Sequence, residues 1–334
     1  MAGRNFLYDQ GIWQSRTFPV PLIGVGNLTV GGTGKTPHVE YLLRLLQGFH
    51  RATLSRGYGR KTKSFILADE KATSSSIGDE PFQYYLDFPG VAVAVCEDRI
   101  KGMERLLEIL PATEVVLLDD VFQHRPVQPH LNLLVTDYGR LFYRDVVMPT
   151  GRLREHPTGA KRADAVIVSK CPAGLTAEEM DQIRGKVRFY AREETPVFFS
   201  TYRYGEPIPF GGAAVCQQKV ILVTGIATPA PINDYLRQAG FTVVEHLAFR
   251  DHYPYTAEDL EKIKKLIAAS NGEPLSVITT RKDAVRLLEP AYKPLREALP
   301  LFYLPIEVSF LRDQENFDKL VLSRVKTISE GSFL

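Results

Sequence analysis

The sequence has few cysteines, no long apolar run and little excess of charge of either sign. Its three cysteines, Cys96, Cys171 and Cys216, are widely spaced, which excludes a disulfide framework or a zinc-ligand pattern and indicates reduced thiols in a cytoplasmic setting. No apolar stretch approaches the ~18 residues of a membrane span, and the charged first twenty residues predict neither a signal peptide nor a spanning helix. A net charge of +2 over 334 residues gives no indication of nucleic-acid binding.

What is present is a repeated alternation of strand-like and helix-like segments, which predicts an α/β fold. Continuous apolar strands separated by amphipathic helices indicate a parallel sheet covered on both faces. A less regular segment, 188–209, separates two such series. We therefore predict a P-loop NTPase-type parallel-sheet domain over 1–195 and a smaller α/β domain over 196–334 that closes over the site, with a boundary uncertain by about ten residues. The strands expected in the first series are 21–28, 51–55, 91–95, 114–118, 131–136 and 164–169.

The segment VGNLTVGGTGKTP, residues 25–37, has the character of a phosphate-binding loop but departs from its usual spelling. The standard pattern is G-x-x-x-x-G-K-[ST], and here Thr29 occupies the position of the first glycine. The physical requirements are nevertheless met, because the glycines allow backbone N–H groups to converge on phosphate oxygens at a helix N-terminus. Lys35 supplies a charge for the β- and γ-phosphates, and Thr36 supplies a hydroxyl for Mg²⁺. We expect the nucleotide to bind at Thr29, Val30, Gly31, Gly32, Thr33, Gly34, Lys35 and Thr36.

A second motif supports this interpretation. The segment EVVLLDDVFQH, residues 114–124, is an apolar strand that ends in Asp119 and Asp120. In nucleotide-dependent enzymes such a strand lies beside the strand of the phosphate loop and brings carboxylate to the metal. Taken alone, an acidic strand end is as often an ordinary surface turn. Together with the loop, it predicts a Mg²⁺ site that includes Thr36, Asp119 and Asp120.

Further phrases give the sequence a specific resemblance to a known family. VGNLTVGGTGKTP is followed in order by LSRGYGR (54–60), GDEP (78–81), LDDVFQH (118–124), GRLRE (151–155), a histidine phrase F-x-D-H (249–252) and KDAVRL (282–287). This order, over nearly the whole chain, resembles the tetraacyldisaccharide 4'-kinases. The spelling of the first phrase, with threonine in place of glycine, is distinctive of that family.

The resemblance implies an activity and a location. It implies ATP-dependent phosphorylation of the 4'-hydroxyl of a tetraacylated disaccharide 1-phosphate, which gives lipid IVA in lipid A biosynthesis, with Mg²⁺ as the metal. It further implies a peripheral enzyme, expected to be a monomer, at the cytoplasmic face of the bacterial inner membrane.

The resemblance also assigns roles to individual residues. The acid of GDEP, Asp79, and the histidine His252 of the second domain act in the family as a catalytic dyad. Arg99, of the phrase CEDR, joins Lys35 and the dyad in the expected catalytic set, and Glu155, of GRLRE, is expected as a further acid on the metal side.

The chain departs from the family pattern in three ways. Val121 stands where glycine is usual after the paired acids, and Arg281 stands where glutamate is common. The family usually has an additional N-terminal hydrophobic helix, whereas this sequence begins close to the phrase RNFLYDQG. We therefore expect a different anchorage or a native start that differs from the one given.

Two other functions remain open from the residues alone. One is a soluble P-loop kinase or ligase that acts on a small metabolite. The other is a GTPase-type metallochaperone, although the phrase VSKC at 168–171 lacks the asparagine and aspartate of a guanine-reading motif. Membrane association is expected through a basic segment and an apolar N-terminal one, which contain Arg51, Arg56, Arg60, Lys61 and Lys63, and Phe6, Leu7, Ile12 and Trp13 respectively.

Overall fold

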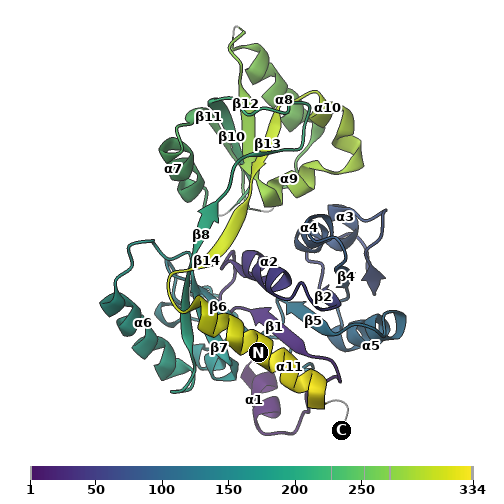
Figure 1. The fold of residues 1–334 in the computed structure, drawn as a ribbon, viewed down its shortest axis with the longest axis vertical. Coiled ribbons are helices and arrows are strands. Elements are labelled where there is room, and N and C mark those ends of the chain that lie inside the picture. The colour runs from purple at the N-terminus through teal and green to yellow at the C-terminus, as the bar shows by residue number, and fades with distance from the viewer. Residues whose placement is uncertain (1, 227, 252, 271, 332–334) are drawn as a thin grey trace.

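The computed structural model describes residues 2–226, 228–251, 253–270 and 272–331. Two sheets organise these residues, and Figure 1 shows them one above the other. Within the described residues the larger sheet has nine strands in the order β14-β8-β7-β6-β1-β5-β2-β4-β3, in which β3 and β14 are antiparallel to their neighbours and the others are parallel. Its strands are β1 (Leu22–Gly26), β2 (Arg51–Ser55), β3 (Ile66–Leu67), β4 (Ala92–Val95), β5 (Val115–Asp119), β6 (Leu131–Asp137), β7 (Ala165–Ser169), β8 (Val197–Tyr204) and β14 (Ile306–Phe310).

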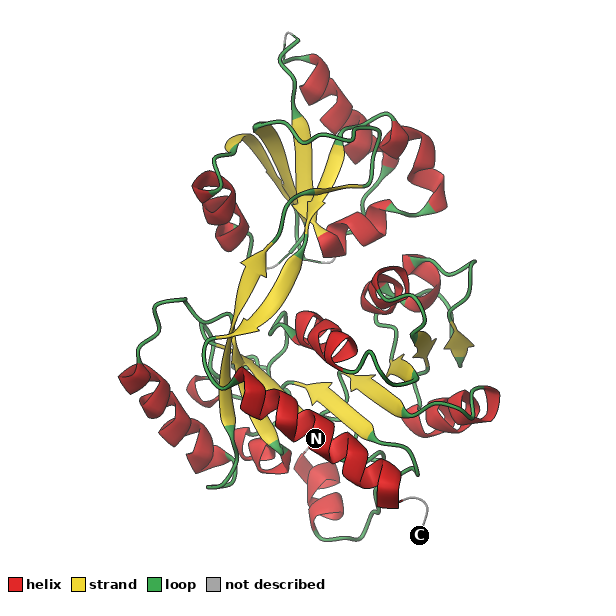
Figure 2. Ribbon diagram, in the orientation of Figure 1, coloured by secondary structure: helices red, strands yellow, loops and turns green. Residues whose placement is uncertain are grey.

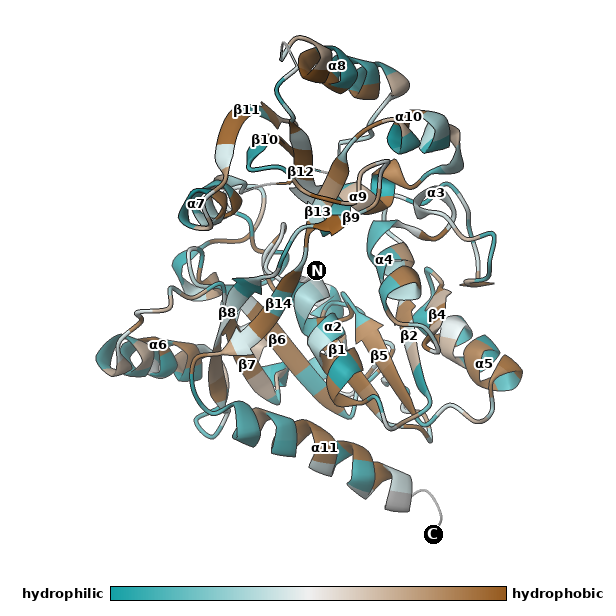
Figure 3. Cartoon of the chain, turned by 45° about the horizontal axis from the view of Figure 1, so that its top comes forward, coloured by the Kyte–Doolittle hydropathy of each residue, from teal (hydrophilic) through white to brown (hydrophobic). Residues whose placement is uncertain are grey.

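The central strands of this sheet are buried on both faces, as their apolar sequences predict. β1 lies between β5 and β6, and every residue of β1 and β5 is buried. Figure 3 shows these strands mostly in the colour of hydrophobic residues. The parallel register pairs Val25 with Asp119, so the end of β5 lies beside the start of the glycine-rich loop. The expectation that the acidic strand adjoins the loop strand is confirmed.

Helices cover both faces of the larger sheet. On one face α2 packs with the C-terminal helix α11, whose side chains Phe317, Val321 and Val325 belong to the same core as Val39 and Leu43 of α2. The first domain contains α1 (Ala2–Asp9), α2 (Lys35–Leu45), α3 (Ser74–Ile77), α4 (Asp79–Asp87), α5 (Arg99–Ile109), α6 (Ala177–Tyr190) and α11 (Gln314–Gly331). No helix among the described residues combines the length and apolarity that crossing a bilayer requires.

The second sheet has five strands within the described residues, in the order β11-β10-β12-β13-β9, of which β9 is antiparallel to β13. The strands and helices of this smaller domain follow the alternation expected from the sequence. They are β9 (Ile208–Pro209), β10 (Lys219–Thr224), α7 (Ala230–Gln238), β11 (Thr242–Ala248), α8 (Ala257–Ala268), β12 (Ser276–Thr280), α9 (Arg281–Leu287), α10 (Lys293–Glu297) and β13 (Leu301–Leu304). The α/β fold class with two sheets is therefore confirmed.

Two long strands connect the two domains. β8 pairs with β7 over its first residues and with β14 over its last, so that Ile306 lies opposite Tyr204 (Figure 2). The sequence analysis assigns the whole of 196–334 to the second domain. In the structure the chain instead returns to the first domain after β13. There β14 and α11 pack with the larger sheet, because their apolar side chains complete its core.

Candidate active site

A large cavity lies between the two domains, at the ends of the strands where the phosphate loop begins. Its volume is about 1990 Å³. The loop 30–36, the acids Asp119 and Asp120 and part of α4 line it from the first domain, and Arg281 and Tyr303 line it from the second. Ligands of open α/β sheets bind at this carboxyl edge.

The backbone of the loop explains why Thr29 can replace the usual glycine. Thr29 is buried and bridges to Leu153 as extended chain. The left-handed conformations fall later, at Gly31 with φ 105° and at Gly34 with φ 92°. Only those two positions require the conformational freedom of glycine. The backbone at position 29 is extended, so threonine fits where the standard pattern has glycine. Gly34 then caps the N-terminus of α2, where backbone N–H groups attract phosphate.

Side chains that follow β1, end β7 and lie on α2 hold the loop in this shape. Asn27 of the β1 end donates from Nδ2 to Thr33 Oγ1 at 2.8 Å, and Ser169 at the end of β7 donates to the Thr33 carbonyl at 2.6 Å. His38 of α2 contacts the Gly34 carbonyl through Nδ1 at 2.7 Å and Ser200 Oγ of β8 through Nε2 at 2.9 Å. Burial lowers the pKa of His38 to about 4, so this histidine is a neutral tether at physiological pH.

The loop lysine forms an ion pair with the second acid of the strand motif. Lys35 Nζ lies 3.2 Å from Asp120 Oδ1, and Arg154 Nη1 donates to both carboxylate oxygens of Asp120 at 2.9 Å. Burial alone would raise the pKa of Asp120, but Lys35 and Arg154 outweigh it and hold that pKa below its ordinary value. Asp120 adopts a left-handed backbone conformation, with φ 51°, at the turn where β5 ends.

Asp119 has a different environment. Its Oδ2 accepts a hydrogen bond from the Tyr84 hydroxyl at 3.0 Å, whereas its Oδ1 is buried with no hydrogen-bond partner among the described residues. Burial raises the pKa of Asp119 to about 6, although the charge of Lys35 opposes the shift. A buried carboxylate oxygen without a partner is costly, so its orientation indicates that a ligand completes the site.

These residues fit a hard divalent cation. Mg²⁺ is commonly bound by one or two carboxylates together with substrate phosphates and water. The Thr36 hydroxyl at the start of α2 and the carboxylates of Asp119 and Asp120 are oxygen donors of that kind. No cluster of three or more His, Cys, Asp or Glu side chains suited to a metal occurs in the described part of the chain.

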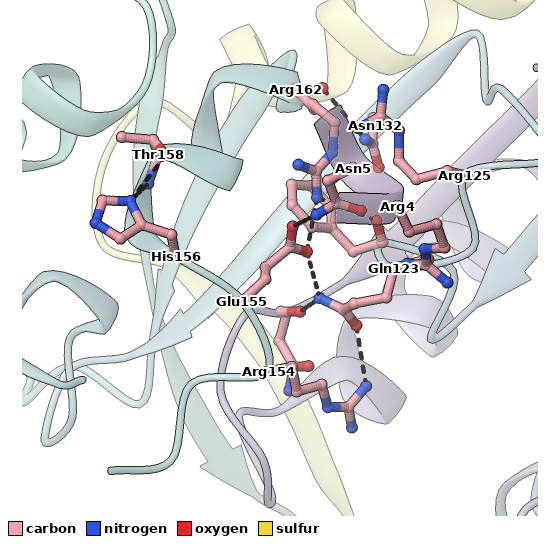
Figure 4. A network of polar contacts seen from close by, with 12 residues as sticks. Arg4, Asn5, Gln123, Arg125, Asn132, Arg154, Glu155, His156, Thr158 and Arg162 are labelled. Atoms are coloured by element: carbon pink, nitrogen blue, oxygen red, sulfur yellow. Dashed lines mark hydrogen bonds and ion pairs between the residues drawn. The ribbon is translucent and has the colours of Figure 1, made fainter. Parts of the chain in front are cut away.

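Glu155 lies beside this site but is engaged elsewhere. Its carboxylate, 4% exposed, accepts from Asn5 Nδ2 at 2.7 Å, Gln123 Nε2 at 3.0 Å and Arg162 Nη2 at 2.7 Å (Figure 4). Gln123 also accepts from Arg154, which holds Asp120. The network thus connects α1 to the acidic pair, and Glu155 is not among the residues that line the cavity.

Arg99 and His124 lie at the same end of the cavity. Arg99 is the first residue of α5 and is buried, with Nη1 donating to the carbonyls of Cys96 and Glu97 and with Nε lacking a hydrogen-bond partner among the described residues. Burial lowers its pKa, against the attraction of the two aspartates. Burial and the nearby Arg99 lower the pKa of His124 to about 4. A buried cation that lines a phosphate cavity can neutralise charge on a nucleotide.

Asp79 begins α4 at the junction of the two domains and, like Glu155, is not among the residues that line the cavity. Its Oδ2 accepts from Arg286 Nε of the second domain at 2.7 Å. The other member of the expected dyad, His252, lies outside the described residues, and its role stays a prediction. Its neighbour Asp251 lines the cavity.

The structure therefore brings the loop, Asp119, Asp120 and Arg99 to one cavity and places Asp79 at the domain junction. Sequence reasoning missed several residues that organise this region: His38, Arg154, Lys170 and Arg286. Lys170, for example, pairs with Asp137 at 2.7 Å and also donates to the Gly32 carbonyl. Only its position after a strand in the phrase VSKC could have drawn attention to it.

The departures from the family pattern have local explanations. Val121 is buried against β1, where a Cβ on Gly24 would lie only 2.8 Å from its Cγ1. The larger residue after the acids is thus accommodated by a glycine on the neighbouring strand. Arg281 pairs with Asp87 of α4 and stacks over Tyr303, so it contributes to the contact between the domains.

A phosphate loop that faces paired acids from an adjacent parallel strand is the arrangement of P-loop kinases and related NTPases, and the fold and site place the chain in that class. The model of the tetraacyldisaccharide-1-P 4'-kinase family (LpxK) matches residues 1–326. The chain belongs to this family, which consists of kinases of lipid A biosynthesis. This membership decides against a metallochaperone and against a kinase or ligase of small metabolites.

Individual relatives agree with the family match. The tetraacyldisaccharide 4'-kinase of Bacteroides thetaiotaomicron is 42% identical over 98% of this chain and 90% of its own length. That of Flavobacterium johnsoniae is 42% identical over 97% of this chain and 92% of its own. A crystal structure of LpxK from Aquifex aeolicus in complex with ATP superposes with a TM-score of 0.74 at 31% identity, over 97% of this chain and 94% of the other.

Proposed function

We propose that this kinase binds ATP at residues 29–36 and transfers its γ-phosphoryl group to the 4'-hydroxyl of a tetraacyldisaccharide 1-phosphate. The observation that carries the proposal is the ion pair between Lys35 and Asp120, which places a cation at the mouth of the loop and a carboxylate opposite it. The Aquifex aeolicus relative was solved with ATP, which supports the choice of nucleotide.

Mg²⁺ would be held by Thr36, Asp119 and Asp120, and it would supply charge neutralisation between the phosphates. Lys35 binds the β- and γ-phosphate oxygens and neutralises the charge that develops during transfer. Arg99 adds a second buried cation on the same side of the cavity. Glu155, which the resemblance places near the metal, supports Gln123 and thereby Arg154 and Asp120, and we propose that it acts through them.

Asp79 is proposed to accept the proton of the 4'-hydroxyl, with His252 as its partner. The hydroxyl oxygen forms the new bond to phosphorus, the bond from phosphorus to the ADP oxygen breaks, and the hydroxyl proton passes to Asp79. Such acid–base help contributes typically about 10²- to 10⁴-fold to rate, and positioning and charge neutralisation supply the rest. Because Asp79 is paired with the second domain, closure of the domains positions the acceptor.

The shape of the cavity agrees with a lipid acceptor. Several large apolar side chains line it while remaining well exposed, and exposed apolar surface of this kind can mark a lipid-binding site. They are Val30 at 40%, Tyr58 at 70%, Leu86 at 36% and Met148 at 48% exposed. We propose that acyl chains or the lipid surface cover them when the substrate is bound.

The enzyme is further proposed to work as a peripheral protein at the cytoplasmic face of the inner membrane. The structure divides the basic segment that was expected to dock there. Arg51 begins β2 and donates to the Leu43 carbonyl, whereas Lys61 and Lys63 follow the other end of that strand, which is ~13 Å long at the usual rise per residue. Arg60 is paired with Glu97. Lys61 and Lys63 are therefore the better candidates, together with exposed Phe6, Ile12 and Trp13.

Co-sedimentation with phosphatidylglycerol vesicles tests the membrane proposal. We expect binding at low salt that weakens at high salt and weakens further in Lys61→Gln/Lys63→Gln, because each cation near an anionic leaflet contributes about 1 kcal/mol. A matched control is Lys262→Gln/Lys265→Gln on α8, which removes two exposed lysines of the second domain. An equal loss of vesicle binding in both double variants, or no binding at low salt, would refute electrostatic docking. Neither result would bear on the kinase assignment.

The kinase proposal itself is tested by acceptor-dependent ATP turnover. Purified protein is supplied with labelled ATP, Mg²⁺, detergent and tetraacyldisaccharide 1-phosphate, and ADP release is followed with and without the acceptor. We expect turnover that requires the acylated acceptor. Turnover that is unaffected by the acceptor would contradict the proposed reaction.

A further inference from the structure

Helix α4 of the first domain and helix α9 of the second are joined by ion pairs at both ends of α4. Among the described residues, Asp79 pairs with Arg286 at 2.7 Å and Glu80 with Lys282 at 2.9 Å, both near the start of α4. At the other end of α4, Asp87 pairs with Arg281, which begins α9. The two helices lie side by side at the junction of the domains in Figure 1, and they make direct contact.

The Arg286 side of this contact is anchored more firmly than the others. Arg286 is 7% exposed, and its Nη1 donates to Asp283 Oδ1 at 2.9 Å and to the Gly225 carbonyl at 3.3 Å. Asp283 is fully buried and accepts from the Gly225 amide at 3.0 Å and from the Thr280 hydroxyl at 2.7 Å. The guanidinium is thus fixed by the second domain before its Nε reaches Asp79.

We propose that Arg286 is a positioning residue for Asp79: it holds one carboxylate oxygen of the proton acceptor and favours the ionised state of that group. The inference rests on the proposed role of Asp79. A charged guanidinium that donates to a carboxylate at hydrogen-bond distance both orients the carboxylate and stabilises its charge. The cation comes from the second domain, so the acceptor is correctly set only when the domains are together.

Other charges surround Asp79 and must be considered with Arg286. Glu80 follows it on α4 and is itself paired with Lys282 of α9, and Asp283 lies behind Arg286. From the loop after β11, Asp251 lines the cavity between the domains, and residue 252 lies outside the described residues. The cation that pairs with Asp79, Arg286, is itself buried.

The alternative is that Arg286 only clamps the domains together. The pair Arg281–Asp87 provides a matched control, because Arg281→Gln also removes one ion pair between α4 and α9 but at the end remote from Asp79. A clamp predicts similar effects of Arg286→Gln and Arg281→Gln. A positioning role predicts different effects, because only Arg286 touches the acceptor.

The experiment compares kcat, both KM values and the pH–rate profile in the two variants and in Arg286→Lys. For Arg286→Gln we expect kcat to fall about 10- to 100-fold, within the range of acid–base help, with KM for ATP little changed. The acidic limb of the pH–rate profile of this variant should move to higher pH by about one unit, because the ionised carboxylate of Asp79 loses a neighbouring cation. In Arg286→Lys the acidic limb should lie closer to its wild-type pH, and in Arg281→Gln it should stay at the wild-type pH.

Two further variants keep the outcome decisive. Arg286→Gln leaves Asp283 as an uncompensated buried charge, so Arg286→Gln/Asp283→Asn removes both charges and serves if the single variant does not fold. An acid limb that stays at the wild-type pH in this folded double variant, or that moves equally in Arg281→Gln, overturns the positioning role. Asp79→Asn separates the two proposals, since a fully active Asp79→Asn would overturn the proposed function of Asp79 itself.

Discussion

The Lys35 ammonium lies 3.2 Å from an Asp120 carboxylate oxygen, which also accepts from Arg154. A loop cation and a strand-end acid therefore share one partly exposed site. Because the ammonium lies between Gly34 and Thr36 at the start of α2, it can move from the carboxylate to a phosphate oxygen with little change of backbone. The predictions below follow from this arrangement and its surroundings.

Lys35→Ala should nearly abolish product formation and leave the fold intact. Losing a preorganised charge that stabilises a transition state typically costs about 10²- to 10³-fold in kcat. The measurement is initial rate with the lipid acceptor, alongside circular dichroism to verify folding. Lys101→Ala, on the exposed side of α5, is the control for loss of a lysine. A folded Lys35→Ala protein with wild-type turnover would contradict the assignment of the nucleotide site to this loop.

Gly34→Ala should damage the loop far more than Gly32→Ala. A Cβ at Gly34 would collide with the Tyr202 hydroxyl, and its φ of 92° disfavours any side chain. At Gly32 a Cβ meets nothing within 4 Å. We expect ATP affinity, measured by isothermal titration calorimetry, to fall much further for Gly34→Ala. Equal losses for the two substitutions would contradict the described loop conformation.

Much of this site could be predicted from the sequence, because its parts lie on local motifs. The loop, the strand that ends in Asp119 and Asp120, and the first-series strands follow from apolar runs and glycine patterns, and their adjacency follows from parallel-sheet rules. Pairing between Tyr204 and Ile306 could not be predicted, since it joins segments far apart in the chain. The same holds for α11, whose packing on α2 depends on where the chain returns.

The partners of the motif residues were also beyond sequence reasoning. Glu155 is the last residue of the phrase GRLRE, yet its three hydrogen-bond donors come from α1 and from segments near 123 and 162. Likewise, the phrase KDAVRL does not predict that Arg286 donates a hydrogen bond to Asp79 of the first domain. Such contacts arise from tertiary geometry, which spacing along one chain does not encode directly.

Asp79 and His252 should behave as one unit in the kinetics. Each alanine substitution is expected to lower kcat by about 10²-fold or more, with ATP affinity little changed. The double variant should be scarcely slower than the slower single one, because groups that act together are not additive. Steady-state rates of the two singles and the double decide the matter, and effects that multiply would count against a dyad.

Glu40 should give the protein a distinct pH dependence of stability. Burial, with help from Asp87, raises the pKa of Glu40 from 4.5 to about 7. The folded state therefore holds a proton that the unfolded state releases, so this contribution to the free energy of unfolding is present below pH 4.5 and is lost as the pH rises to about 7. Glu40→Gln, which keeps a side-chain oxygen that can accept from Gln83 Nε2, should remove that loss.

The check on Glu40 is urea unfolding of wild type and Glu40→Gln at several pH values between 4.5 and 7.5. As the pH rises, the free energy of unfolding of the wild type should fall steadily relative to that of Glu40→Gln. Glu178→Gln, on the exposed face of α6, should show no such trend. A difference that stays constant with pH would mean that Glu40 is ionised in the folded protein throughout this range.

The central claim is that the cavity between the domains transfers phosphate to one particular sugar oxygen. The most direct test is to incubate the purified protein with ATP, Mg²⁺ and tetraacyldisaccharide 1-phosphate and to locate the new phosphate by ³¹P–¹H correlation NMR. The account predicts a product phosphorylated at the 4'-oxygen, formed by wild type and not by Lys35→Ala. Phosphate at another position, or equal product from Lys35→Ala, would contradict it.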